Sequence, residues 1–200
     1  MIHNIHIRLF YYFKQCCICI KNNKRLLFWY LFLFAFGVII SALIYKDFSC
    51  EDSSGLFLSC IIQGEYSYIK CFFRFLFICL LGSIISILSC VLKCFRFFRC
   101  LYPIFLGLIC YKIILLEILC STLLGILSIF IFIFPAFSIL LFSFLMNSIY
   151  VNPYLNCYKS AIVGCNFKNI LLFHAKFLLL ICPSLLFLIV LLPFILSLFF

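Results

Sequence analysis

The segment Leu26–Tyr45 constrains this chain more than any other, because it carries no charged residue over 20 positions. As a helix it would be about 30 Å long, which is the thickness of the hydrocarbon core of a membrane. A helix also satisfies its own backbone hydrogen bonds where water is absent. Lys21, Lys24 and Arg25 precede the segment. This pattern predicts a first membrane-spanning helix over residues 26–45, with the N-terminus in the cytoplasm.

The composition of the whole chain excludes a water-soluble fold. Of the 200 residues, 68% are hydrophobic and 10% are charged, and the mean hydropathy is +1.36. So few polar residues cannot cover the surface of a soluble core of this size, so the lipid bilayer has to cover it. The basic residues behind the net charge of +10 lie mostly at the edges of apolar runs, where anionic headgroups attract them. We therefore expect no nucleic-acid partner.

Four further apolar runs are long enough to cross a membrane. The turn at residues 93–100 holds three basic residues and no acid, whereas residues 46–70 hold four acidic residues against two lysines. These charges place the turn in the cytoplasm and the acidic segment outside. We predict an all-α fold, a polytopic transmembrane helical bundle that crosses the cell membrane about five times, with a cytoplasmic N-terminus. The predicted domains are a basic amphipathic cytoplasmic segment (1–25) and a transmembrane domain (26–200) with spans at 26–45, 72–92, 101–120, 122–145 and 172–197.

Prolines and small residues indicate how these spans pack. Pro135 predicts a kink in the fourth span, because proline lacks the backbone N–H that a regular helix uses. Pro183 and Pro193 predict that residues 170–200 form one long, bent fifth helix, since 31 residues are too few for two full spans. The second span carries four small residues near one face, which suits close helix packing: Gly82, Ser83, Ser86 and Ser89.

Three charged residues within the apolar runs are the strongest functional candidates: Arg74, Lys112 and Glu117. An ionisable group at the centre of a membrane costs about 2.5–3.5 kcal/mol on insertion scales, so its presence calls for a role. Lys112 and Glu117 are five residues apart and point to different faces of a regular helix, so Glu117 is able to pair with Arg74 instead. The alternative is that the outer turn starts earlier and that Lys112 and Glu117 lie among the headgroups.

Fifteen cysteines are present, and most lie inside apolar runs, where cysteine behaves as a small hydrophobic residue. Cys50 and Cys60 lie in the acidic outer segment, so they are a candidate disulfide. Cys16 and Cys19 form a C-x-x-C pattern, but no second pair of ligands accompanies them, and packing is the simpler explanation. We therefore predict no metal site and no cofactor.

Catalytic signatures are missing from the sequence. It contains no H-E-x-x-H, P-loop or G-x-S-x-G motif and no pair of intramembrane carboxylates. Catalysis needs several converging groups, such as a nucleophile with its base. We therefore expect that the protein is not an enzyme.

Four segments resemble the stage II sporulation protein M family of bacterial membrane proteins. They are NNKRLLFWYLFLFAFGVIISA (22–42), CLLGSII (79–85), FIFIFPAF (130–137) and YKSAI (158–162). Members of that family act with peptidoglycan-degrading partners during engulfment in spore formers. The resemblance implies a structural or scaffold protein that interacts with other membrane or envelope proteins in sporulation or cell-wall remodelling. The alternative is a small transporter or channel subunit that uses Arg74, Lys112 and Glu117.

Overall fold

Five helices of the structure are long and apolar enough to cross a membrane, which confirms the predicted all-α fold with five spans. The structure is a computed structural model. Some predictions lie outside the residues that it describes. They concern the predicted amphipathic segment before residue 21, of which only residue 18 is described, and four cysteines: Cys16, Cys19, Cys50 and Cys60. The described residues are 18, 21–46, 67–92, 95–120, 122–152 and 167–197.

The five spans are built from α-helices and two short π-helices, and three of the spans are single helices. The fourth span joins α6, the π-helix η1 and α7, and the fifth joins α8, the π-helix η3 and α9. In chain order the elements are α2 (Lys24–Ile44), α4 (Tyr68–Val91), α5 (Phe95–Cys120), α6 (Thr122–Ser128), η1 (Ile129–Ile133), α7 (Phe134–Val151), α8 (Phe167–Leu186), η3 (Phe187–Leu191) and α9 (Leu192–Ser197).

The helices extend beyond the predicted spans at several ends. α5 begins at Phe95, not at Leu101, so Arg96 and Arg99 belong to the helix and not to a turn. α7 continues to Val151, although the fourth span was predicted to end at Leu145. Helical hydrogen bonds are made by the backbone, so a helix continues past the last apolar side chain wherever neighbouring helices cover its polar residues.

Each of the two segmented spans changes to π geometry just before a proline. η1 ends two residues before Pro135, and η3 ends two residues before Pro193. A proline ring presses against the carbonyl group four residues earlier, and in both spans that carbonyl lies inside the π-helix. The wider π turn accommodates it. Pro135 and Pro193 therefore mark local changes of helix type, whereas Pro183 lies within α8. The predicted kink at Pro135 and the predicted bend of the fifth span stay predictions.

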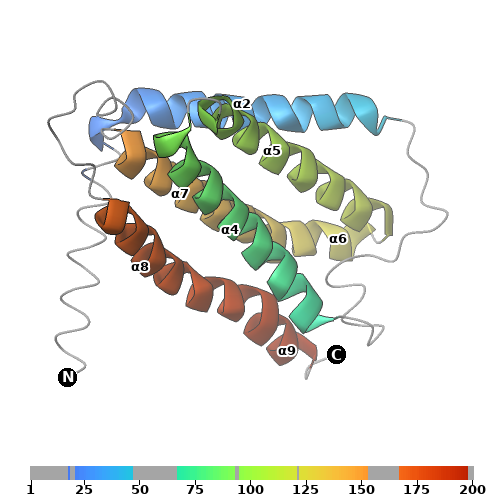
Figure 1. Cartoon of the computed structure of the whole chain (residues 1–200). Helices are drawn as coiled ribbons and strands as arrows, with labels where there is room; N and C mark the ends of the chain where they lie inside the picture. Colours follow the sequence, from blue (N-terminus) through green and yellow to red (C-terminus); the bar gives the residue numbers. More distant parts are fainter. Residues whose placement is uncertain are drawn as a thin grey trace, which may run out of the picture.

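The bundle consists of two parallel helix pairs and one further helix (Figure 1). α2 and α5 run in one direction, and α4 and α7 run in the opposite direction. α7 is the centre of the bundle, because it contacts α2, α4, α5 and α8, and its span has the largest buried share. We call the end where α2, α5 and α8 begin and α4 and α7 end the Arg99 end. The opposite end, where α5 turns into α6, is the Glu117 end.

The most extensive helix contact joins α2 to α5 through small residues. A Cβ atom added to Gly37 would lie 2.9 Å from Ile104 Cα, and one added to Gly107 would lie 2.9 Å from the Val38 nitrogen. Both distances are shorter than van der Waals contact, so the two backbones touch at this point. One turn further along, the Ser41 hydroxyl donates a hydrogen bond to the Leu108 carbonyl oxygen at 3.1 Å.

The α4–α7 pair is joined by polar side chains at a constant offset along the two chains. Cys79 Sγ lies 3.5 Å from Ser143 Oγ, and one turn later Asn147 Nδ2 donates to Ser83 Oγ at 2.9 Å. Such a ladder requires parallel helices in register. The four small residues predicted to line a packing face of α4 are all buried, which confirms that prediction: Gly82, Ser83, Ser86 and Ser89.

Candidate functional site

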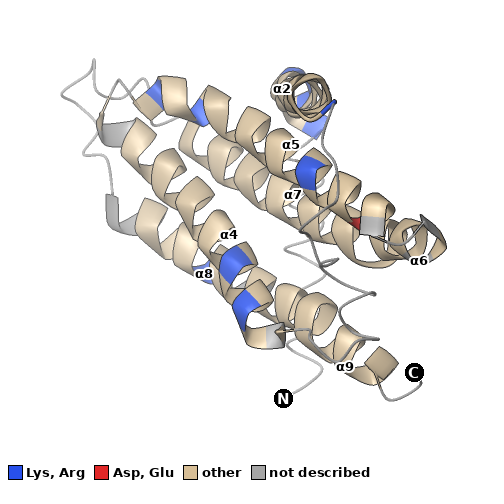
Figure 2. Ribbon diagram, turned by 90° about the vertical axis from the view of Figure 1, so that its right-hand side faces the viewer, with Lys and Arg blue, Asp and Glu red and all other residues tan. Residues whose placement is uncertain are grey.

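The three predicted charged residues lie in different environments and do not form one site. Arg74 is exposed on α4, where it lines a shallow hollow together with Lys70, Phe73 and Phe77. Figure 2 shows how few charges the described helices carry.

Lys112 and Glu117 occupy different faces of α5, as their five-residue spacing implies. Lys112 is exposed, and its Nζ lies 5.7 Å from the centre of the Tyr45 ring at the end of α2. Glu117 is fully buried at the corner between α5 and α6, where its backbone carbonyl packs against Gly125. The glycine permits this close approach, since a Cβ atom there would lie 2.7 Å from the Glu117 carbonyl carbon.

A different set of polar residues is gathered inside the bundle, at the Arg99 end. We call it the polar cluster: Tyr30 of α2, Ser83 of α4, Arg99 of α5, and Asn147, Ser148 and Asn152 at the end of α7. Except for Asn152, these side chains are buried, with exposed fractions between 0% and 7%. Burial of this many polar groups within a membrane protein is costly, so it marks a candidate functional site.

Contacts link the members of the polar cluster to one another. Asn147 donates to Ser83, as described above. Arg99 Nη2 donates to Asn152 Oδ1 at 3.4 Å, a long and weak hydrogen bond. The Tyr30 hydroxyl lies beside the Arg99 guanidinium and Ser148. The cluster therefore extends from α4 through α7 to α2 and α5.

Aromatic rings pack directly against the polar cluster. Phe144 packs between two tyrosines, with its ring centre 5.3 Å from that of Tyr30 and 4.5 Å from that of Tyr102. The Tyr102 hydroxyl donates to the Ile78 carbonyl oxygen at 2.6 Å, and its ring lies over Gly82, where a Cβ atom would collide with it. This packing holds α2, α4, α5 and α7 in a fixed arrangement around the cluster.

Arg99 is the unusual member of the polar cluster, because no carboxylate of the described helices lies near its charge. Its exposed fraction is 7%, and Nη1 has no hydrogen bond of good geometry within the described helices. Glu117 lies 18 residues further along α5, which corresponds to about 27 Å. The other four acidic residues of the sequence lie between Asp47 and Glu65, outside the described residues.

Other atoms at the Arg99 end also have unused hydrogen-bonding capacity. Ser148 Oγ and Asn147 Oδ1 have no partner of good geometry in the described part of the chain. His174 of α8, which the sequence presents as a residue at a helix end, is 2% exposed, and its Nδ1 donates to the Ile170 carbonyl oxygen at 2.8 Å. His174 Nε2 is buried without a partner among the described residues.

A packed apolar layer separates the polar cluster from Glu117. Its side chains have exposed fractions of 0% or 1%, and they come from α5, η1, α7, α8 and η3. Large apolar side chains with so little exposed surface indicate close packing between the two sites. The members of the layer are Leu106, Phe132, Ile133, Leu140, Leu185 and Ile189.

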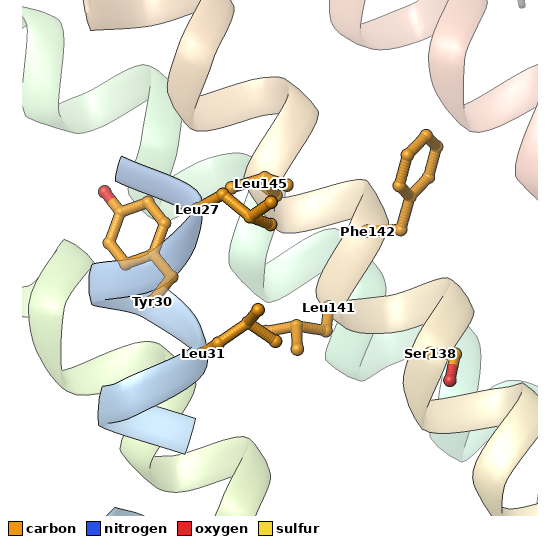
Figure 3. A pocket seen from close by; sticks show the side chains of 7 residues that line it. All are labelled: Leu27, Tyr30, Leu31, Ser138, Leu141, Phe142 and Leu145. Carbon is orange, nitrogen blue, oxygen red and sulfur yellow. The ribbon is translucent and has the colours of Figure 1, made fainter. Parts of the chain in front are cut away.

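An apolar groove lies between α2 and α7, next to the polar cluster (Figure 3). Figure 3 shows Leu27 lying against Leu145 and Leu31 lying against Leu141, while the Tyr30 hydroxyl points away from these leucines. The Tyr30 ring lines this groove, and its hydroxyl belongs to the polar cluster. Tyr30 is therefore the residue that both sites share.

Sequence reasoning missed most of the polar cluster, because it assigned Arg99 to a cytoplasmic turn and placed Asn147 and Ser148 in a loop. No group of three or more His, Cys, Asp or Glu residues in the described helices is arranged to hold a metal ion. No family model, curated protein or solved structure matches this chain. The resemblance to the stage II sporulation protein M family stays a prediction.

Proposed function

We propose that this chain is a structural subunit of a membrane assembly, a multipass protein of the cell membrane that binds other membrane or envelope proteins and performs no chemistry. The observation that carries the proposal is the packed apolar layer described above. A transporter needs polar groups along a route across the membrane. Here the polar cluster and Glu117 lie on opposite sides of that layer.

The lipid-facing surface of α2 supports a binding role. α2 is the least buried of the five spans, and one side of it presents large side chains outward. Phe28 and Leu43 are each 73% exposed, and Trp29 and Phe32 are 50% and 53% exposed. A transmembrane helix of a partner protein can pack against such a surface through van der Waals contacts.

The second candidate function is a small transporter or channel subunit. The observation that favours it is the complete burial of Glu117, since a buried ionisable group in a membrane protein frequently belongs to an ion pathway. Replacing Lys112 and Glu117 by leucine separates the two functions. A scaffold retains its partners in this double variant, whereas a transporter loses its flux.

The scaffold role can be tested by replacing Phe32, on the exposed side of α2, with a photo-crosslinking residue. We expect irradiation of intact membranes to give one reproducible protein adduct. The matched control is the same probe at Leu106, which is fully buried and should give none. Loss of the Phe32 adduct in the Trp29→Ala variant would show that the α2 surface makes the contact.

Two results would overturn the scaffold proposal. One is solute flux in proteoliposomes of the purified protein that disappears in the variant with Lys112 and Glu117 replaced by leucine. The other is a double variant that is present at the normal level in membranes and yet has lost the Phe32 adduct. Cell-wall remodelling proteins are the first partners to examine, because the family resemblance implies them.

A further inference from the structure

We propose that Arg99, together with Tyr30 and Ser148, binds the phosphate group of an anionic membrane lipid at the Arg99 end of the bundle. The acyl chain of this lipid occupies the groove between α2 and α7. This lipid site does not depend on the scaffold role, because it is tested on the purified chain without any partner.

The first reason is the uncompensated charge of Arg99. Removing a guanidinium from water is costly unless an anion pairs with it, and the penalty persists in a membrane protein. Arg99 is 7% exposed, and its Nη1 has no partner of good geometry in the described helices. The groups beside it, Asn152 Oδ1 at 3.4 Å from Nη2 and the Tyr30 hydroxyl, are both uncharged. The positive charge of Arg99 is therefore balanced by no residue of the described helices, and an anion would pair with it.

The second reason is that the described part of the chain supplies no anion near Arg99. Glu117 lies about 27 Å away along α5, beyond the packed apolar layer. No other acidic residue lies in the described helices, because the remaining four lie between Asp47 and Glu65, outside the described residues. Two exposed basic residues, Lys24 and Arg25, add positive charge at the Arg99 end.

The third reason is the chemistry and depth of the donors. A guanidinium binds phosphate oxygens through two parallel N–H donors, and hydroxyl groups add further donors. The Tyr30 hydroxyl lies beside the Arg99 guanidinium and also beside the Ser148 hydroxyl, so the three groups lie close together. Arg99 is four residues, or about 6 Å, beyond the first residue of α5, which corresponds to the depth of lipid headgroups near a helix end.

The fourth reason identifies a lipid as the source of the phosphate. The groove between α2 and α7 extends from Leu27 and Leu145 toward Leu31 and Leu141, away from the Arg99 end (Figure 3). An acyl chain in this groove therefore has its headgroup at the Arg99 end. The Tyr30 ring lines the groove and the Tyr30 hydroxyl neighbours Arg99, so one residue contacts both parts of the ligand.

The test measures binding of phosphatidylglycerol, phosphatidylcholine and inorganic phosphate to the purified full-length protein in a non-ionic detergent. Native mass spectrometry detects lipid adducts, and thermal unfolding detects stabilisation. We expect phosphatidylglycerol to give an adduct of one lipid and to raise the unfolding temperature. Phosphatidylcholine should bind less well, since its own cation competes for the phosphate. If inorganic phosphate stabilises the protein as much as phosphatidylglycerol does, the lipid proposal is overturned in favour of a soluble anion.

Variants assign the binding to Arg99. We expect Arg99→Gln to weaken phosphatidylglycerol binding by about tenfold or more, because a charge-assisted bidentate contact is lost. Arg25→Gln is the matched control, since it removes an exposed positive charge at the same end, and it should change the affinity less than about twofold. Equal losses in the two variants would mean that charge alone attracts the lipid, and the specific site would be rejected.

Stability distinguishes a binding role of Arg99 from a structural one. In lipid-free detergent, Arg99→Gln should unfold at the same temperature as the wild type or higher, because an unpaired buried charge is removed. With phosphatidylglycerol present, the wild type should unfold at a higher temperature than Arg99→Gln. If Arg99→Gln is less stable under both conditions, Arg99 is structural and the proposal fails.

Tyr30→Phe provides a second variant that does not remove a charge. It keeps the ring in the groove and removes only the hydroxyl, so we expect an unchanged unfolding temperature without lipid and an affinity for phosphatidylglycerol lowered by about three- to tenfold. Unchanged affinity in both Tyr30→Phe and Ser148→Ala would overturn the assigned site.

Discussion

The contact between α2 and α5 predicts that a single added methyl group destabilises the bundle. In Gly37→Ala the new Cβ atom lies 2.9 Å from Ile104 Cα, and closer still to the Ile104 carbonyl oxygen. The two helices therefore have to separate by about 0.5–1 Å, and a gap of this size loses a quarter to a half of each van der Waals contact.

The expected magnitude is the difference between two opposing effects. Overpacking in a close-packed interface costs about 1–3 kcal/mol. Alanine is a better helix former than glycine by about 1 kcal/mol, which offsets part of that cost. We therefore expect Gly37→Ala to lower the free energy of unfolding by about 0–2 kcal/mol. Gly107→Ala should have a similar effect.

The assay is unfolding of the purified protein in detergent, followed by circular dichroism during titration with sodium dodecyl sulfate. Ala35→Leu is the matched control, because it adds bulk to the exposed side of α2 without a large change in helix propensity, and it should be neutral. The double variant of Gly37 and Gly107 should lose less than the sum of the single losses, since one separation of the helices relieves both clashes. A Gly37→Ala variant that is more stable than the wild type by about 1 kcal/mol would show the gain in helix propensity without a clash, and would refute the close contact.

Three further predictions concern the polar and charged residues. Tyr102→Phe should lower the free energy of unfolding by about 1 kcal/mol, because it removes only the hydrogen bond to the Ile78 carbonyl oxygen; an unchanged unfolding midpoint would contradict that bond. Asn147→Ala and Ser83→Ala should show a coupling energy of about 0.6 kcal/mol in a double-mutant cycle, and strict additivity would mean that the two side chains do not interact. Lys112→Gln should change the stability by no more than about 1 kcal/mol, because the side chain is exposed and its ring contact is weak, and a larger loss would indicate a buried role.

The number of spans was predictable from the sequence because a bilayer imposes its own length on every helix that crosses it. Leu26–Tyr45 is recognisable without any knowledge of its neighbours, and the observed helix is displaced by only one or two residues. The end of α7 was not predictable in this way. Asn147 and Ser148 resemble the start of a loop unless it is known that α4 and α2 cover them.

The candidate site was less predictable than the fold, because it depends on contacts between helices that are far apart in the sequence. Whether Arg99 is buried depends on Tyr30 and Ser148, which come from helices far away in the sequence. The contact between α2 and α5 had one local signal, the small residues Gly37 and Ser41 at a four-residue spacing. Their partner Gly107 has no such signal, so the pairing of the two helices became visible only in the structure.

The two parallel pairs have a consequence for how the chain is assembled. Neighbours in a parallel pair are never consecutive in the sequence, so α2 acquires its partner only after α4 and α5 have been synthesised, and α4 acquires its partner only when α7 emerges. During that interval Gly37 and Ser83 face lipid or the insertion machinery. A nascent chain at this stage therefore presents to the membrane the small and polar side chains that the mature protein hides.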